Sequence, residues 1–386
     1  MKNANVIIPC YAADTSGVCS ALYELGGMTV VHDASGCNTT YSTHDEPRWY
    51  DIDSMIFISA LTEIDAIMGN DEKLISDAVS AAADLHPEFI AICGSPMPMM
   101  TGVDFDAIAE EVEQRTGIRT FGLHTNGTRS YSEGASEAFL ALTREYVREC
   151  PKREGIGVNI IGATPLDLPW NTTIGSIRKW LTDCGFEYVS CLAMDGTLDE
   201  IRQAASAKVN LVVSYAGMAA AEHMLDEFGI NYVCGIPFGE GFGRQLAENI
   251  REAAAAAEAG CVSPYGMSFD EPDCTADTVI IGESISAKSL AQAIKLDMGI
   301  GASVICPLPT DDMLLSDKDL CLYAEEDIRA ALERIKPKQV IADPLYRYII
   351  PNESRHIELP HFAFSGRCFQ KDMKDLINKD IKELFE

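Results

Sequence analysis

The stretch between Cys10 and Cys37 reads CYAADTSGVCSALYELGGMTVVHDASGC and gives the first indication of the fold. Its apolar, β-branched run at Met28–His32 predicts a buried strand, and residues 6–9 predict another. Cys10 and Cys37 each follow one of these strands, and Cys93 closes a further expected strand. Ligands bind at the carboxyl ends of strands in parallel sheets, so this arrangement indicates a binding site built from thiols.

The same alternation of strands and helices continues along the whole chain. The expected strands are the short β-branched runs at residues 6–9, 28–32, 55–59, 89–93, 120–123, 157–161, 188–192, 211–215, 232–236, 279–282, 303–307, 340–343 and 356–359. Longer stretches with helical periodicity lie between them, at residues 71–85, 104–116, 132–149, 174–184, 198–207, 218–228, 243–259, 287–298 and 325–335. Such alternation is typical of parallel βαβ units and predicts an α/β fold.

Two polar, loop-like stretches divide this alternation. CPKREG, at residues 150–155, follows a long expected helix, and CVSPYGMSFDEPDC, at residues 261–274, follows an alanine-rich one. Proline, glycine and clustered polar residues are typical of linkers between domains. We therefore expect three Rossmann-like domains, at residues 1–151, 152–270 and 271–386, each a small parallel sheet flanked by helices.

The composition disfavours several kinds of partner. The 386 residues include 59 acidic and 30 basic ones, which gives a net charge of −29. Nucleic acids and anionic membranes attract basic surfaces, so we expect neither as a partner. The acidic charge either serves solubility or speeds docking to a basic protein.

The hydrophobic segments and the cysteine spacing indicate where the protein is located and whether its cysteines are thiols. No segment approaches the ~20 apolar residues of a membrane span, and the first residues lack the pattern of a secretion signal. We therefore expect a cytoplasmic protein. Its thirteen cysteines include no CxxC motif. In a reducing compartment they are thiols, most of them buried, with a minority available to ligate metal.

The opening stretch resembles the first cluster-binding segment of the nitrogenase component 1 family. In that family a cysteine precedes a helix that starts at a glycine, and a turn of sequence HGPxGC follows about one strand later. Here six residues separate Cys10 from Gly17, and VVHDASGC retains His32, Gly36 and Cys37 of the turn.

Later stretches extend the resemblance over essentially the whole chain. Residues 61–74 (LTEIDAIMGNDEKL) and 89–108 (FIAICGSPMPMMTGVDFDAI) are similar to the rest of the family's first domain. Residues 157–167 (GVNIIGATPLD) follow the pattern of its second domain, and residues 356–369 (HIELPHFAFSGRCF) resemble its closing segment. The order and spacing of these stretches carry the resemblance, rather than any single motif.

The resemblance implies an iron–sulfur cluster, either [4Fe–4S] or similar to a P-cluster. Its expected ligands are Cys10, Cys37 and Cys93, and for each the alternative is a buried core thiol. At the position of the family's third cysteine this chain has Pro96, and Cys93 stands shortly before that position. Cys19, inside the expected first helix, is interpreted as a core residue. The resemblance also implies that an identical or related subunit supplies the remaining ligand, and that an ATP-dependent iron–sulfur protein donates electrons.

Two departures from the family narrow the function. Ser214 stands where subunits that reduce dinitrogen have the cysteine of the molybdenum–iron cofactor, and His361 is offset by one residue from the cofactor histidine. A hydroxyl is a poor ligand for iron in place of a thiolate, so we expect no molybdenum–iron cofactor. Instead, Ser214, His361 and Arg367 are predicted to border a substrate cavity, with Arg367 binding a carboxylate. The alternative for Arg367 is an ion pair with a surface acid.

Three functions are compatible with these observations. The first is the iron–sulfur subunit of an anaerobic, nitrogenase-like two-component reductase that acts on an organic molecule such as a tetrapyrrole, not on dinitrogen. The second is a non-catalytic scaffold on which a metallocluster of the same family is assembled. The third is a binding protein for a small ligand that kept the fold and lost the metal.

Overall fold

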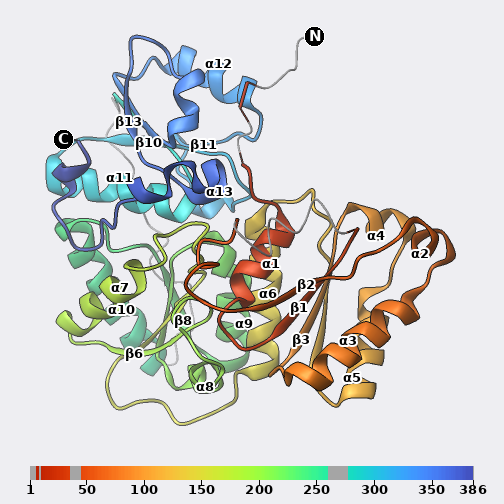
Figure 1. Ribbon diagram of the computed structural model, residues 1–386. Helices are drawn as coiled ribbons and strands as arrows, with labels where there is room; N and C mark the ends of the chain where they lie inside the picture. The colour runs from red at the N-terminus through yellow and green to blue at the C-terminus, as the bar shows by residue number, and fades with distance from the viewer. Residues whose placement is uncertain (1–5, 8–9, 35–44, 260–276, 386) are drawn as a thin grey trace.

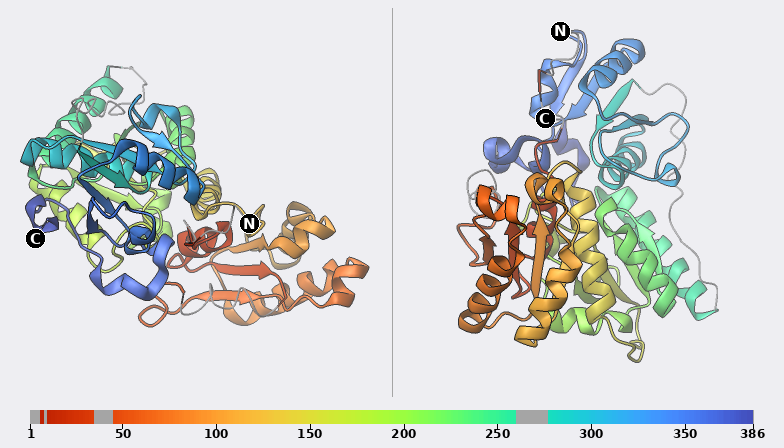
Figure 2. Two further views of the ribbon diagram at one scale, coloured as in Figure 1. Left: turned by 90° about the horizontal axis from the view of Figure 1, so that it is seen from above. Right: turned by 90° about the vertical axis from the view of Figure 1, so that its right-hand side faces the viewer.

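The computed structural model describes residues 6–7, 10–34, 45–259 and 277–385. It confirms the expected α/β fold, with three parallel sheets that are each flanked by helices. The second and third sheets lie one above the other, and the first extends to one side of them (Figures 1 and 2). Among the described helices, none combines the length and the hydrophobicity that a membrane span requires.

The first sheet has the strand order β2-β1-β3-β4. Its strands are β1 (Met28–His32), β2 (Met55–Ile58), β3 (Ile90–Gly94) and β4 (Thr120–Leu123). The helices around it are α1 (Asp14–Leu22), α2 (Glu63–Met68), α3 (Asp71–Leu85), α4 (Pro96–Thr101), α5 (Phe105–Thr116) and α6 (Tyr131–Tyr146). Every residue of β1 and β3 is buried, as is usual for parallel strands that helices cover on both faces.

The second sheet has the order β6-β5-β7-β8. Its strands are β5 (Gly157–Ile161), β6 (Glu187–Cys191), β7 (Val209–Val212) and β8 (Asn231–Cys234). Its helices are α7 (Thr173–Asp183), α8 (Leu198–Arg202), α9 (Met218–Phe228) and α10 (Glu240–Glu258).

The third sheet has the order β11-β10-β9-β12-β13. Its strands are β9 (Thr278–Ile281), β10 (Ala302–Cys306), β11 (Leu320–Cys321), β12 (Gln339–Ala342) and β13 (Arg355–Glu358). Its helices are α11 (Ser284–Met298), α12 (Glu325–Ile335) and α13 (Phe362–Ser365). The expected domain boundary at residues 270 and 271 lies outside the described residues, and the exact boundaries stay predictions.

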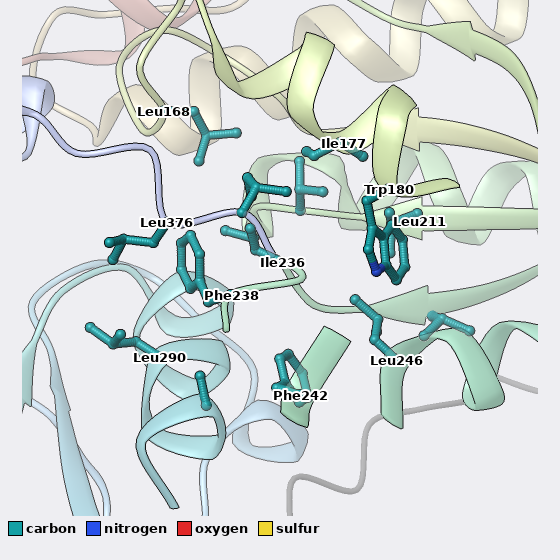
Figure 3. Packing of buried hydrophobic residues seen from close by; sticks show 14 of the residues in the cluster. Leu168, Ile177, Trp180, Leu211, Ile236, Phe238, Phe242, Leu246, Leu290 and Leu376 are labelled. Carbon is teal, nitrogen blue, oxygen red and sulfur yellow. The ribbon is translucent and has the colours of Figure 1, made fainter. Parts of the chain in front are cut away.

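The second and third sheets share one hydrophobic core. Trp180 of α7 and Phe238, beyond β8, belong to the same buried cluster as Leu290 of α11 and Leu376. Figure 3 shows Phe238, Leu290 and Leu376 close together where the two domains meet. Such shared burial of apolar surface holds the two sheets together as one body.

Helices α1 and α6 cross at very short range. A Cβ atom added at Gly17 would lie 1.9 Å from the carbonyl oxygen of Tyr131. A Cβ atom added at Gly134 would lie 1.9 Å from the carbonyl oxygen of Asp14. Only glycine allows the two backbones to approach this closely, which explains the need for Gly17 after Cys10.

The prediction of a strand at residues 6–9 is wrong for the described Val6 and Ile7. Their backbone N–H groups donate to Oε2 of Glu325, at 2.8 and 2.7 Å, and neither belongs to a sheet. Farther along, the N–H of Ala12 donates to the carbonyl of Ala363 at 3.0 Å. The segment that precedes α1 therefore packs on the third domain, and Cys10 does not follow a strand of the first sheet.

Candidate functional site

A buried polar cluster lies where the three domains meet, centred on Asp167. Asp167 follows β5, and its Oδ2 atom accepts a hydrogen bond of 2.7 Å from Oγ of Ser214, which follows β7. Its Oδ1 atom accepts a hydrogen bond from the phenol of Tyr131, the first residue of α6. Nε2 of His361, which follows β13, lies 3.1 Å from the same Oδ1 atom. One carboxylate thus joins side chains from all three domains.

Burial sets the chemistry of this cluster. The side chains of Asp167 and Ser214 are almost wholly inaccessible to solvent, and the low local dielectric strengthens their hydrogen bond. Burial, and then the charge of Asp167, raises the pKa of Tyr131 well above its usual range. The phenol therefore remains a hydrogen-bond donor at neutral pH.

A second carboxyl group, Glu283, lies in the same buried region. It follows β9 and caps α11, where Oε1 accepts from the N–H of Ile285 at 3.1 Å and Oε2 accepts from the N–H of Ser286 at 2.8 Å. Burial, and then the charge of Asp167, raises the pKa of Glu283 to about 7. A carboxyl group with this pKa can give or take a proton near neutral pH.

His361 is held in place at several points. Its backbone N–H donates to Oδ2 of Asp343 at 2.9 Å, and its ring packs on Phe364 with 4.4 Å between centroids. Its Nδ1 atom is buried and has no hydrogen-bond partner among the described residues. A cavity of about 50 Å³, lined by His361, Asp167 and Glu283, lies beside it and has room for a few water molecules.

The structure brings together two of the three predicted substrate residues. Ser214 and His361 both bind Asp167, whereas Arg367 faces a separate cavity of about 440 Å³. There Nη2 of Arg367 donates to the carbonyl of Glu46 at 2.8 Å. Within the described residues Arg367 forms no ion pair, so the alternative of a surface salt bridge has no support.

Cys10 is partly buried beside an interdomain cavity. It lines a cavity of about 570 Å³ between the first and third domains, and its Sγ atom lies 3.6 Å from the carbonyl oxygen of Ala363. Burial raises the pKa of Cys10 to about 12, so without a metal the thiol keeps its proton. Metal binding would displace that proton.

Cys93 and Cys37 differ from Cys10. Cys93 is wholly buried within β3, where its backbone lies between Val31 and Leu123 of the neighbouring strands. Its side chain belongs to a buried hydrophobic cluster, which is the placement of a core thiol and does not support a ligand role. Burial also raises its pKa well above the usual range. Cys37 lies outside the described residues. The described part of the chain holds no group of three or more His, Cys, Asp or Glu side chains that could bind a metal ion.

The sequence reasoning missed three members of the buried cluster. Glu283 lies just beyond the end of β9, much as Ser214 lies just beyond the end of β7. Because ligands bind at the carboxyl ends of parallel strands, its position could have identified it as a candidate. Asp167 lies several residues beyond β5, and Tyr131 opens a helix. Neither residue stands at the end of a strand, and the packing of the domains brings them together.

Comparison with known proteins places the chain in a family. A model of the family described as "Nitrogenase component 1 type Oxidoreductase" matches residues 17–262. The chain is 28% identical over 179 residues to the nitrogenase iron-molybdenum cofactor biosynthesis protein NifE of Clostridium pasteurianum, a match that covers 46% of this chain and 38% of that protein. It is 21% identical over 321 residues to a light-independent protochlorophyllide reductase subunit of Leptolyngbya boryana, a match that covers 73% of this chain and 62% of that one.

The fold agrees with this assignment. The structure of nitrogenase Cp1 at pH 6.5 superposes with a TM-score of 0.69 at 12% sequence identity, over 100% of this chain and 93% of that one. The chain spans only about a third to a half of the length of the curated relatives NifE of Clostridium pasteurianum and the nitrogenase α chains that it matches. Because the family model matches more than half of the residues, the chain belongs to the nitrogenase component 1 type oxidoreductases.

Proposed function

We propose that the chain is the iron–sulfur subunit of a nitrogenase-like two-component reductase in the cytoplasm of an anaerobic cell. It receives low-potential electrons from an ATP-dependent iron–sulfur partner and reduces an organic molecule, not dinitrogen. Membership of the family supports an oxidoreductase with an iron–sulfur cluster. Similarity to a protochlorophyllide reductase favours a flat, conjugated, tetrapyrrole-like substrate.

The observation that carries this proposal is the joint binding of Ser214 and His361 to Asp167. By resemblance, these two residues stand at or beside the positions of the ligands of the molybdenum–iron cofactor. A serine hydroxyl is a poor ligand for iron, and both side chains already bind a buried carboxylate. Ser214 and His361 therefore do not fit the molybdenum–iron cofactor. Their hydrogen bonds to Asp167 suit the transfer of protons instead.

Protons are what the reduction of an organic double bond requires besides electrons. Glu283, with a pKa of about 7, can hold a proton beside the small cavity at neutral pH. The carboxylate of Asp167 accepts hydrogen bonds, so it keeps the proton of His361 on Nε2 and leaves Nδ1 as an acceptor in the neutral ring. Ser214 and Tyr131 fix the orientation of Asp167.

For the cluster we propose thiolate ligands from Cys10 and Cys37, with a further ligand from a partner subunit. When bound, the cluster supplies electrons one at a time. Cys10 already faces an interdomain cavity, and Cys37 is proposed on its sequence context alone. By resemblance, the cluster is either [4Fe–4S] or a larger, P-cluster-like group.

We propose that this partner is a second component 1 subunit, identical or related, which binds the first domain. The supporting feature is the apolar surface of α2 and α4, at the edge of the first domain (Figure 1). The surface consists of the exposed side chains of Ile64, Ile67, Met68, Met97, Met99 and Met100. Apolar patches of this kind on a protein surface usually mark an interface.

The test begins with anaerobic purification. We expect a brown protein with about four or more iron atoms per chain, whose cluster becomes reduced only when an ATP-dependent reductase component and ATP are both present. Electron paramagnetic resonance follows that reduction. A colourless chain without iron, or a cluster that the reductase component does not reduce, would contradict the proposal.

A second candidate function is a scaffold for the assembly of a metallocluster. The match to NifE, whose name is that of a cofactor biosynthesis protein, favours it. A scaffold would pass its cluster to an apoprotein without the ATP-dependent reductase component. Measurement of iron transfer, with and without that component, separates the two candidates.

A further inference from the structure

Two cysteines of the third domain lie side by side in its sheet. Cys306 is the last residue of β10 and Cys321 is the last residue of β11, and the two are directly paired across these parallel strands. Neighbouring strands lie about 4.8 Å apart, which is within the range of about 4.4–6.8 Å that a disulfide spans between Cα atoms. Both residues are free cysteines, so the backbone already has the spacing that a disulfide requires.

The two thiols share one hydrogen-bond acceptor. The Sγ atom of Cys306 donates to the carbonyl oxygen of Leu308 at 3.4 Å, and the Sγ atom of Cys321 donates to the same oxygen at 3.6 Å. Both sulfur atoms therefore lie on one face of the sheet, beside the same backbone carbonyl. Neither side chain has to change face for the two sulfur atoms to bond.

The carboxylate of Asp319 holds the short strand β11 in this register. Its Oδ1 atom accepts from the N–H of Val304, in β10, at 2.7 Å. Its Oδ2 atom accepts from the N–H of Ser316 at 2.8 Å and from Nζ of the buried Lys288 at 2.6 Å. These bonds fix the chain just before Cys321 against the neighbouring strand. The two thiols are thus positioned for reaction before any oxidant arrives.

The two cysteines differ in their access to solvent. Cys321 is exposed, whereas Cys306 is wholly buried, and burial raises the pKa of Cys306 above its usual range. The phenol of Tyr323 forms a hydrogen bond with Cys321, and this bond, followed by burial, raises the pKa of Tyr323 to about 12. The phenol therefore stays protonated and can donate to the sulfur atom of Cys321. A dissolved reagent reaches Cys321 first, because Cys306 lies behind it in the sheet.

We propose that Cys306 and Cys321 are a redox modification site, which forms a reversible disulfide by exchange with a low-molecular-weight disulfide. The thiolate of Cys321 attacks one sulfur of the reagent, whose sulfur–sulfur bond breaks, and a mixed disulfide forms as one thiolate leaves. The sulfur of Cys306 then attacks the sulfur of Cys321 and expels the second thiolate. The protons of both cysteines pass to the two released thiolates. The cysteines thus lose two electrons, and the reagent gains them as two thiols.

The site lies in the wall of the cavity that contains Cys10. Leu308, whose carbonyl accepts from both thiols, and Tyr323, which bonds to Cys321, both line that cavity of about 570 Å³. In the disulfide neither cysteine has a proton to donate, so the carbonyl of Leu308 loses both donors. Oxidation therefore changes the hydrogen bonds of this wall. The inference goes beyond the proposed function, because it needs neither the cluster nor the reductase component.

The test treats the full chain, purified anaerobically, with oxidised glutathione. Remaining thiols are then blocked with iodoacetamide, and mass spectrometry of the peptides identifies every disulfide and every glutathione adduct. We expect a disulfide between Cys306 and Cys321 that is at least ~10-fold more abundant than the glutathione adduct on Cys321, because the second thiol is held beside the first. Dithiothreitol should restore both thiols.

Two variants separate the roles of the cysteines. Cys306→Ser keeps a donor for the carbonyl of Leu308 but removes the second thiol, so Cys321 should accumulate the glutathione adduct at least ~10-fold above its level in the native chain. Cys321→Ser should leave Cys306 unmodified, because that thiol is buried.

Cys368→Ser is the matched control. Cys368 is also exposed, so it should carry a glutathione adduct in the native chain, and its loss should leave the disulfide between Cys306 and Cys321 unchanged. Equal adduct on Cys321 in the native chain and in Cys306→Ser would overturn the proposal. So would an unreacted Cys321 in a native chain whose Cys368 has reacted, a result that stands even if a variant fails to fold.

Discussion

The hydroxyl of Ser214 donates a hydrogen bond of 2.7 Å to Oδ2 of Asp167, although 47 positions separate the two residues. Both are buried, so Ser214→Ala would leave a carboxylate oxygen without this donor. We expect the free energy of unfolding to fall by about 1–3 kcal/mol, as measured by urea denaturation. The control is Ser76→Ala, which removes an exposed hydroxyl from α3 and should change stability by less than ~0.5 kcal/mol. Equal effects in the two variants would contradict the structural role of Ser214.

The pKa of Glu283 predicts how stability depends on pH. Its pKa rises from its ordinary 4.5 in the unfolded chain to about 7 in the folded one. Between these values the folded state binds the extra proton, so the contribution of Glu283 to stability is fully present below pH ~4.5 and is lost as pH rises to ~7. The loss is on the order of 3 kcal/mol, at ~1.4 kcal/mol per pKa unit.

Glu283→Gln should therefore lack this component of the pH profile, and its stability relative to the native chain should rise between pH 5 and pH 8. Denaturation by urea at several pH values measures the difference. Glu326→Gln, which removes an exposed carboxylate from α12, is the matched control. Parallel profiles for the native chain and Glu283→Gln would show that Glu283 does not titrate in this range.

The crossing of α1 and α6 predicts a large effect from one methyl group. Gly17→Ala would place Cβ against the backbone of Tyr131, where no side-chain rotation relieves the clash, and we expect a loss of more than ~3 kcal/mol. Gly175→Ala, in the first turn of α7, meets no atom within 4 Å. It should stabilise the protein by ~0.5–1 kcal/mol. Thermal unfolding of both variants tests the prediction, and similar melting temperatures would contradict it.

The iron content of cysteine variants tests which cysteines are ligands of the cluster. Cys37→Ala should lower the iron per chain and the visible absorbance, because loss of a thiolate exposes an iron site to water and oxygen. Cys19→Ala should leave both unchanged, and so should Cys93→Ser, since both cysteines are buried core residues. Equal loss of iron in Cys37→Ala and Cys19→Ala, or in neither, would contradict the ligand assignment.

The apolar surface on α2 and α4 predicts the state of assembly. We expect a dimer through the first domain that buries more than ~2,000 Å² in total. Ile67→Asp, at a side chain that is 82% exposed, should shift it to monomers in analytical ultracentrifugation. Met313→Asp, at an exposed position of the third domain, should not. A native chain that is monomeric and still holds its cluster would count against a shared interface.

Much of the fold could be predicted because parallel strands are buried on both faces. Such strands read as β-branched runs, and Met28–His32 and Thr120–Leu123 form strands at the residues expected. Residues 6–9 have a similar composition, yet Val6 and Ile7 bind the carboxylate of Glu325 and pair with no strand. Local composition does not reveal whether a partner strand exists.

The site was less predictable than the fold. Ser214 and His361 could be identified because they stand at recognisable positions of the resemblance, and they do meet at one carboxylate. Asp167, which joins them, ends the stretch 157–167 that follows the pattern of the family's second domain, but nothing in that stretch indicates that it would contact both residues. Arg367 is only a few residues from His361 in the sequence, yet its side chain lines a different cavity. The packing of three domains decides these contacts.

The attachment of the first residues to the third domain has a consequence for biosynthesis. Cys10 leaves the ribosome early, but its contact with Ala363 spans 353 positions, and the bond from Val6 to Glu325 spans 319. The surroundings of Cys10 are therefore complete only when nearly the whole chain has been made. A cluster at this cysteine would have to be inserted after translation, and a chain that stops after its second domain would carry the ligand without its pocket.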